Sequence, residues 1–347
     1  MIYTLSSNSS FCDYLASLWL DEQKSDLWGL SQITIYVPTN RAAKTLREAF
    51  LRQSKGKTLL LPKIISFANL DVFDATIPQA ISFIERQLIL SKLIQKKQPM
   101  GEDKAFALAQ SLAELIDEMH QYDVHFEDLK SIAPENFAEH WQETLSFLDI
   151  MDSYWPEILA EKGKTDPSLY QIKQADSLIQ KWQTNKPNDL IYAVGFTGGL
   201  PIVERFLKAV SLLPNGRIYI PDLDTDMSDD IWENVDETHP SYYQKRLLDY
   251  LNVKRKDVIR LDENISDRFH LLSVALTPAA ETQIWQKNLH LHVDENIRLI
   301  ECQTPQNEAF EIACIANARK NSSSCHTGST IGKARQNSNA KMECHLG

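Results

Sequence analysis

The chain has 347 residues, of which 43% are hydrophobic and 24% are charged, and its net charge is −11. This composition is typical of a globular protein of about two to three domains and excludes the collagen-like, disordered and disulfide-scaffold classes. No run of about 20 apolar residues and no secretory leader occurs, so we expect no membrane partner. The five cysteines are irregularly spaced, which favours a cytoplasmic location. The acidic charge argues against a broad nucleic-acid-binding surface.

Strand and helix patterns alternate near the N-terminus and again after residue 190. The β-branched run 31–37 predicts a buried strand, 41–53 an amphipathic helix, and 58–61 a second strand closed by Pro62. This succession favours a parallel sheet with right-handed crossovers. Later segments repeat the pattern, with strands expected at 190–194, 217–220, 258–261 and 297–301 and helices at 201–212 and 241–251.

About a hundred residues between these two parts have apolar side chains at helical spacing. They predict helices at 79–97, 104–122 and 140–162, the last capped by Gly163, and a fourth helix ending near Trp182. We therefore expect an α/β fold, a mainly parallel sheet with an inserted α-helical subdomain. The expected division is a first α/β part at 1–77, the helical subdomain at 78–185, the second α/β part at 186–314 and a tail at 315–347.

The most specific local feature is the turn that follows the strand 31–37. Thr39 and Asn40 precede a helix that opens with Arg41 and carries Lys44 one turn later. Helix N-terminal amides with hydroxyl, amide and cationic side chains form a natural cradle for a phosphodiester, so Thr39, Asn40, Arg41 and Lys44 are our candidate DNA-backbone contacts. The alternative is a plain N-cap, in which Thr39 or Asn40 binds free amides and the cations are solvated.

This turn also carries a resemblance to a known family. It is similar to the turn after the first crossover of superfamily 1 helicases, which touches single-stranded DNA. Six blocks in order resemble AddB proteins of the alphaproteobacterial type, and the resemblance extends from about residue 2 to about residue 314. The blocks begin with VPTNRAAKTLREAFL and LLLPKIISFANLD, and they lie at 37–51, 59–71, 140–168, 194–210, 239–251 and 276–285.

AddB is the second subunit of the AddAB helicase–nuclease, which resects DNA double-strand breaks for recombination. The resemblance implies a helicase-like sheet, DNA as a ligand and an AddA-type subunit as the partner in a heterodimer. Full AddB proteins are much longer, and their nuclease and the cysteines of an iron–sulfur cluster lie in a C-terminal part that this sequence does not contain. The ATP and Mg²⁺ of the complex would then be used by the partner subunit.

Phosphate chemistry has little support in the sequence. The consensus G-x-x-x-x-G-K-[ST] is absent, and Gly56-Lys57-Thr58 follows a predicted helix instead of preceding one. In an active helicase the strand 190–194 would end in an acidic pair that holds Mg²⁺. Here it ends in 195–199 (GFTGG), whose glycines indicate close packing or a turn. We expect a catalytically inactive scaffold without a cofactor of its own. The alternatives are a protein-interaction scaffold that does not bind DNA and a degenerate nucleotide-binding protein.

Other candidate sites have simpler explanations. The acidic run 221–230 could gather a hard cation, although a solvated loop is the simpler interpretation. His290 and His292 alternate as on a strand and could bind zinc only with outside ligands. His140 begins a predicted helix, which favours packing or capping.

The tail 315–347 differs from the rest of the chain. It has five basic residues and one acidic residue, so the preceding 314 residues have a net charge of −15. Its apolar residues follow neither a helical nor a strand period. Reading the codons of Met342-Glu343 one nucleotide later gives a tryptophan, and AddB-type proteins carry a basic-Trp-apolar segment near this point. We hypothesise that the tail is out of frame, in which case its Cys-His pairs are not a metal site. A genuine disordered tail is the alternative.

Overall fold

The computed structural model describes residues 1–5, 10–23, 28–130, 147–262, 267–286 and 299–324. The chain divides into two compact units, Met1–His292 and Val293–Gly347. The first unit contains the sheet and the site described below. In the described part of the chain, no helix combines the length and the apolar character that crossing a bilayer needs.

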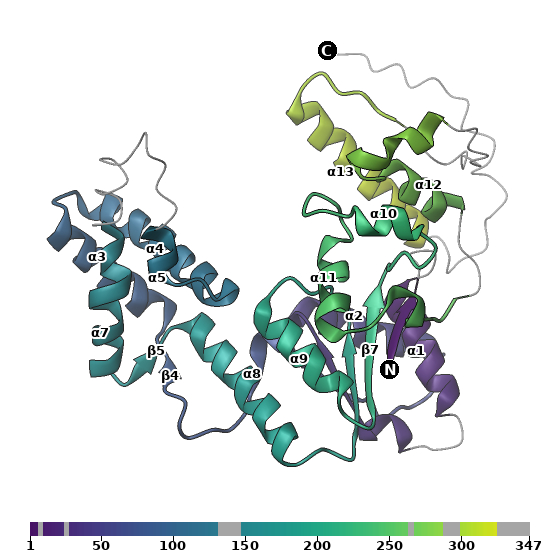
Figure 1. Ribbon diagram of the computed structural model, residues 1–347, viewed down its shortest axis with the longest axis horizontal. Coiled ribbons are helices and arrows are strands. Elements are labelled where there is room, and N and C mark those ends of the chain that lie inside the picture. Colours follow the sequence, from purple (N-terminus) through teal and green to yellow (C-terminus); the bar gives the residue numbers. More distant parts are fainter. Residues whose placement is uncertain (6–9, 24–27, 131–146, 263–266, 287–298, 325–347) are drawn as a thin grey trace. The chain divides into compact units, whose positions relative to one another are not determined.

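A six-stranded sheet forms the centre of the first unit (Figure 1), and every pair of neighbouring strands in it is parallel. The strand order is β3-β2-β6-β7-β1-β8. This confirms the expected mainly parallel α/β fold. The strands are β1 (Ile2–Leu5), β2 (Ile33–Val37), β3 (Lys63–Ser66), β6 (Leu190–Val194), β7 (Gly216–Pro221) and β8 (Ile259–Arg260).

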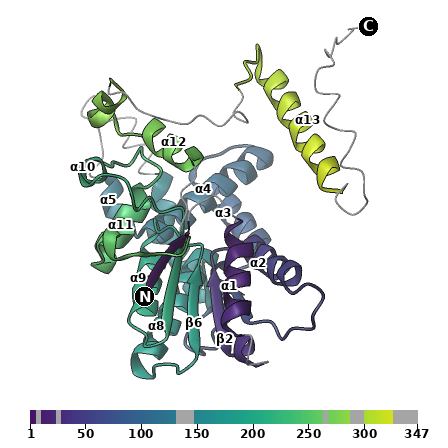
Figure 2. The same cartoon turned by 90° about the vertical axis from the view of Figure 1, so that its right-hand side faces the viewer.

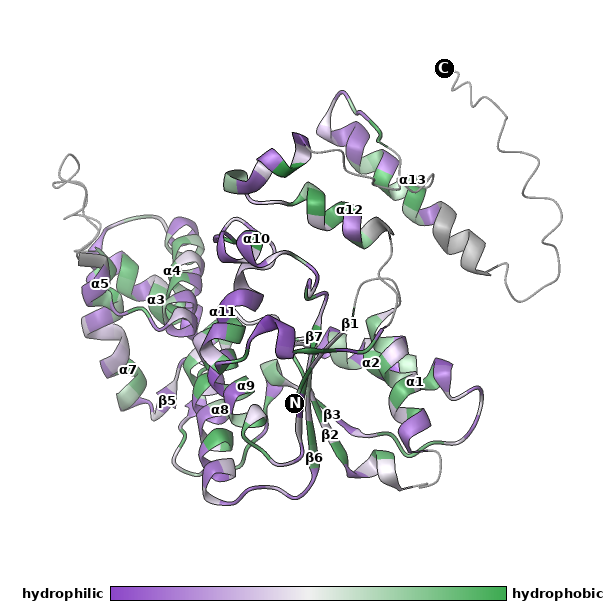
Figure 3. Cartoon of the chain, turned by 45° about the vertical axis from the view of Figure 1, so that its right-hand side comes forward, coloured by the Kyte–Doolittle hydropathy of each residue, from purple (hydrophilic) through white to green (hydrophobic). Residues whose placement is uncertain are grey.

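Helices cover both faces of the sheet (Figure 2). On one face, α1 (Phe11–Glu22) and α2 (Asn40–Gln53) share a core with alternate residues of the strands. On the other face, the core is shared by α8 (Pro167–Thr184), α9 (Pro201–Ser211) and α11 (Tyr242–Leu251). Burial on both faces explains why the strands are mostly hydrophobic along their length (Figure 3).

The helical segment between β3 and β6 has a hydrophobic core of its own, which extends from Ile81 to Leu159. Helix α8 follows this segment, and its residues Ala175, Ile179 and Trp182 belong to the core beside the sheet. The fourth predicted helix therefore packs on the sheet. The elements of the segment are β4 (Gln79–Ala80), α3 (Phe83–Lys97), α4 (Glu102–Tyr122), α5 (Phe126–Lys130), a π-helical turn (Ile150–Tyr154), α7 (Trp155–Glu161) and β5 (Lys164–Thr165).

One predicted strand is absent where we expected it, and a second is absent from the part of its range that the structure describes. Residues 58–61 form no strand, and β3 begins after Pro62, with Ile64 opposite Ile35 of β2. Pro62 has no amide hydrogen to donate to a neighbouring strand, so the proline precedes the paired segment and does not close it. In the stretch 297–301, residues 299–301 form no strand, and the other two lie outside the described residues.

Further α-helices of the described chain are α10 (Asp229–Glu233), α12 (Asp267–Ala275) and, in the second unit, α13 (Pro305–Ser324). Helix α13 continues past residue 315, where we expected the tail to begin, and its side chains from 305 to 317 are exposed. Residues 325–347 lie outside the described residues.

Phe206 of α9 provides a test of this core. Its fully buried ring lies 4.9 Å from that of Phe67 and 5.2 Å from that of Tyr36. We expect Phe206→Ala to lower the free energy of unfolding by about 3–5 kcal/mol in chemical denaturation, because it leaves a cavity among these rings. The control Leu212→Ala, at a side chain that is 68% exposed, should change the free energy by less than about 0.5 kcal/mol. Equal effects would contradict the assignment of the core.

Candidate functional site

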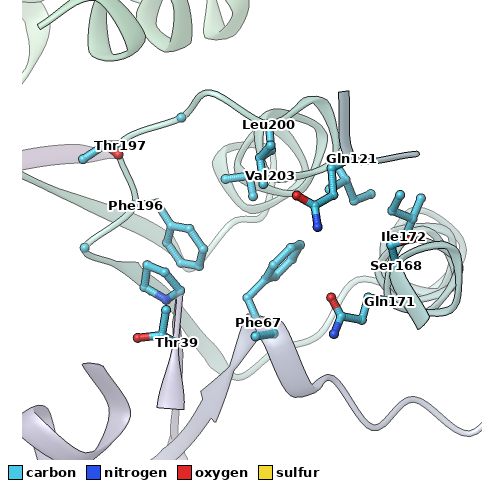
Figure 4. A pocket seen from close by; sticks show the side chains of 15 residues that line it. Thr39, Phe67, Gln121, Ser168, Gln171, Ile172, Phe196, Thr197, Leu200 and Val203 are labelled. Carbon is cyan, nitrogen blue, oxygen red and sulfur yellow. The ribbon is translucent and has the colours of Figure 1, made fainter. Parts of the chain in front are cut away.

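A crevice opens at the edge of the sheet where the strands β2 and β6 end. The two strands are neighbours, but the chain after β2 enters α2 on one face and the chain after β6 enters α9 on the other. Such divergence marks the place where open α/β sheets bind their ligands. A cavity of about 360 Å³ lies there, and we call it the sheet-edge cleft (Figure 4).

Two aromatic rings line the sheet-edge cleft. Phe196 follows β6 and is 3% exposed, and Phe67 begins a short 3-10 turn, Phe67–Asn69, after β3. The ring centroids are 5.8 Å apart and the rings meet edge to face. Both rings also contact Phe206, so they are held in place by the core beneath the sheet edge. Phe67, which is half-buried, therefore offers rigid aromatic surface to a ligand, and Phe196 lies almost wholly buried beside it.

Polar side chains form the remaining walls of the cleft. Gln121, at the end of α4, lies with Ser168 and Gln171, from the first turns of α8, on one side, and Thr39 and Thr197 lie on the other (Figure 4). Neither glutamine side chain has a hydrogen-bond partner among the described residues. An aromatic surface beside free amide groups is suited to a planar ligand with polar edges.

The start of α2 adjoins the cleft through Thr39. The hydroxyl oxygen of Thr39 accepts a hydrogen bond from the amide of Ala42 at 3.2 Å, so Thr39 is the N-cap and Asn40 is the first residue of the helix. The N-cap interpretation is thereby confirmed for Thr39. It uses one amide, and among the described residues the amides of Asn40 and Arg41 have no acceptor.

The four predicted site residues, Thr39, Asn40, Arg41 and Lys44, are all exposed at this end of α2. Lys44 lies 3.9 Å from Glu48, an exposed pair of little energetic weight, and Arg41 has no ion pair among the described residues. Their role in binding DNA stays a prediction. Only Thr39 lines the sheet-edge cleft itself.

Most of the cleft residues were missed from the sequence. Phe196 lies in the glycine-rich segment just after the predicted strand 190–194, so an aromatic residue following a strand was an available signal there. Phe67 gave no such signal, because the strand that precedes it, β3, was predicted at 58–61 instead. Gln121 and Gln171 offered none, because they reach the cleft only through the packing of α4 against α8.

The glycines after β6 allow a close approach between two segments, as we expected from their presence there. Gly198 has φ +87°, and a Cβ atom there would lie 2.9 Å from the backbone oxygen of Tyr243. Gly199 has φ +97° and faces the Tyr243 ring. The positive φ angles and the contact explain why larger residues are excluded. The segment 195–199 carries no carboxylate that could hold Mg²⁺.

The other phosphate candidates do not form a cradle in the described chain. Lys55 and Gly56 have positive φ and form a turn between α2 and β3, so no helix starts there. Residues 6–9, which connect β1 to α1 in the sequence, lie outside the described residues.

The acidic run 221–230 has a structural role. The carboxylate of Asp224 is buried and accepts hydrogen bonds from the amides of Asp226 and Met227 at 3.0 and 2.8 Å. Arg255 donates to the Asp224 carbonyl, and Arg260 pairs with Asp226 at 2.6 Å. The loop is therefore partly buried, which differs from a solvated loop, and arginines pair with two of its five carboxylates.

The metal-site candidates receive no support from the described chain. No group of three potential ligands lies close enough to hold a metal ion among the described residues. Several candidates lie outside the described residues, namely His140, His290, His292, Cys325 and Cys344.

No family model matches the chain, and no curated protein is significantly similar to it.

The Thr39 cap can be tested separately from any ligand. We expect Thr39→Ala to lower the free energy of unfolding by about 1 kcal/mol, because the Ala42 amide loses its acceptor. Thr39→Ser keeps a hydroxyl and should stay close to the wild type. Urea denaturation measures both variants, and equal losses in the two would show that the hydroxyl does not cap α2.

Proposed function

We propose that the chain is a helicase-like scaffold of the AddB type, which binds single-stranded DNA at the edge of its sheet and an AddA-type subunit, without hydrolysing ATP or cutting DNA. The observation that carries the proposal is the position of Thr39, which caps α2 and also lines the sheet-edge cleft. A nucleic-acid strand at this point would meet a helix N-terminus and an aromatic cleft together.

The two halves of the site suit the two parts of a nucleotide. The free amides of Asn40 and Arg41 and the exposed side chains of Arg41 and Lys44 favour a phosphate at the start of α2. The half-buried ring of Phe67, held in place by Phe196, favours an unstacked base in the cleft, because a base of any identity can stack on an aromatic ring. The small number of cations fits a narrow contact on an acidic protein with a net charge of −11.

The end of β6 supports the non-catalytic part of the proposal. Hydrolysis of ATP in such a fold needs carboxylates that hold Mg²⁺ at the carboxyl edge of the sheet. The glycines at 195–199 instead bring this turn against Tyr243 of α11. A calorimetric titration with ATP and Mg²⁺ tests the degenerate nucleotide-binding alternative, for which binding heat is expected. Our proposal expects none.

A protein-binding role without DNA remains the second candidate, since one observation favours it. Helix α3 exposes three large apolar side chains, and Phe83, Ile84 and Leu88 are 61%, 68% and 49% exposed. Exposed apolar clusters are typical of protein-binding surfaces. A pull-down with an AddA-type protein, with and without DNA, separates the candidates, because a DNA-independent scaffold should bind the partner equally in both cases.

The phosphate contact predicts a salt-dependent loss on removal of two cations. We expect the double variant Arg41→Ala with Lys44→Ala to bind a thymidine oligonucleotide more weakly, and the slope of log affinity against log salt to fall by about 1.4. The matched control is Lys92→Ala with Lys96→Ala, which removes the same charge from the exposed side of α3. Equal losses in both double variants, or no loss in the first, would reject the contact at α2.

The base contact predicts a loss that does not depend on salt. We expect Phe67→Leu, which keeps an apolar side chain in the cleft, to weaken oligonucleotide binding by about 1–3 kcal/mol through the loss of stacking. Binding of an abasic oligonucleotide of the same length should not change. Fluorescence anisotropy measures both affinities, and a similar loss for the two oligonucleotides would argue against a base in the cleft.

A further inference from the structure

A buried ionic group lies in the helical segment, away from the start of α2. Arg86 of α3 is 2% exposed, and its Nε atom lies 3.0 Å from Oδ1 of Asp166. Its Nη1 atom donates to Oδ2 of Asp117 on α4 at 2.8 Å, and its Nη2 atom donates to the carbonyl of Ala113 at 2.9 Å. We call Arg86, Asp117 and Asp166 the Arg86 cluster. It joins α3, α4 and the residue that precedes α8.

Both carboxylate oxygens of Asp166 have partners inside the helical segment. It occupies the N-cap position of α8, yet its side chain makes no capping hydrogen bond. Its Oδ2 atom instead accepts a hydrogen bond from the indole of Trp155 at 2.9 Å. A capping carboxylate would stabilise α8 directly, and a buried ion pair is by itself a weak source of stability. The side chain of Asp166 therefore holds Arg86 and Trp155 in place and does not cap α8.

The Arg86 cluster adjoins the wall of the sheet-edge cleft. Asp117 lies one turn before Gln121 on α4, and Asp166 lies two residues before Ser168, and both Gln121 and Ser168 line the cleft. A further contact joins the same two elements, because Nδ1 of His120 lies 3.0 Å from the hydroxyl oxygen of Ser168. Burial lowers the pKa of His120, so this contact involves a neutral ring at pH 7.

We infer that the Arg86 cluster positions the cleft wall: it fastens the end of α4 to the start of α8, so that Gln121 and Gln171 stay at the separation a bound base requires. Arg86 is thus a positioning residue that does not touch the ligand. The identity of the ligand rests on the proposed function, whereas the coupling between the cluster and the wall does not.

The experiment compares Arg86→Met with the wild-type full chain. Hydrogen exchange should become faster in the segments 117–122 and 167–172 and stay unchanged in α1 and α2. Affinity for a thymidine oligonucleotide should fall about tenfold, in the range of one lost base contact. Affinity for an abasic oligonucleotide and the salt slope should not change, since the phosphate contacts at α2 are intact. The control is Arg205→Met, which breaks an exposed pair with Asp176 of α8.

A second variant separates positioning from folding. Removing Arg86 alone leaves the buried carboxylate of Asp166 without its cation, which destabilises a protein interior. In the double variant Arg86→Met with Asp166→Asn the buried charge is reduced, so thermal stability should recover while the faster exchange and the tenfold loss persist. Recovery of oligonucleotide affinity together with stability would overturn the inference.

The failure of the proposed function gives a different result. If the wild-type chain binds thymidine and abasic oligonucleotides equally, the base-binding proposal fails, and hydrogen exchange alone decides the inference. Unchanged exchange in 117–122 and 167–172 of a folded Arg86→Met protein would then overturn it.

Discussion

The parallel pairing of β2 with β6 is the constraint on which the site depends. Because the two strands run in the same direction, both end at one edge, and the helices that follow them leave to opposite faces. The crevice between them is floored by the hydrophobic core itself, since Phe206 contacts both rings of the cleft. The aromatic surface is therefore as rigid as the core, and a helix N-terminus lies beside it.

The local sequence pattern correctly predicted the strands and helices that are packed in the hydrophobic core. The strand 190–194 was found at the predicted bounds, and α9 and α11 lie within one residue of theirs. The error at 58–61 has a different origin, because TLLL and KIIS are both short apolar runs beside Pro62. Only the pairing of Ile64 with Ile35 selects the second run as the strand. Neither tetrapeptide contains a signal for this pairing, because it depends on a residue elsewhere in the chain.

The candidate site divides in the same way. Thr39 could be identified as a cap because capping depends on a few consecutive residues, whereas Gln121 and Gln171 enter the cleft through the packing of two helices about fifty residues apart in the chain. Arg86 was the residue least indicated by the sequence. Its sequence context is that of a surface cation on an amphipathic helix, and its burial depends on carboxylates that come from two other elements.

The position of β1 has a consequence for synthesis in the cell. Among the described strands, β1 pairs with β7 and β8, and Ile2 lies opposite Ile218. A ribosome adds roughly 5–20 residues per second, so the nascent strand waits on the order of 10–40 s for its partner. During that time β2 and β3 are already available to each other. Strand β1 therefore finds its first partner only after β2, β3 and β6 have been made, and its apolar side chains must stay unaggregated until β7 has emerged.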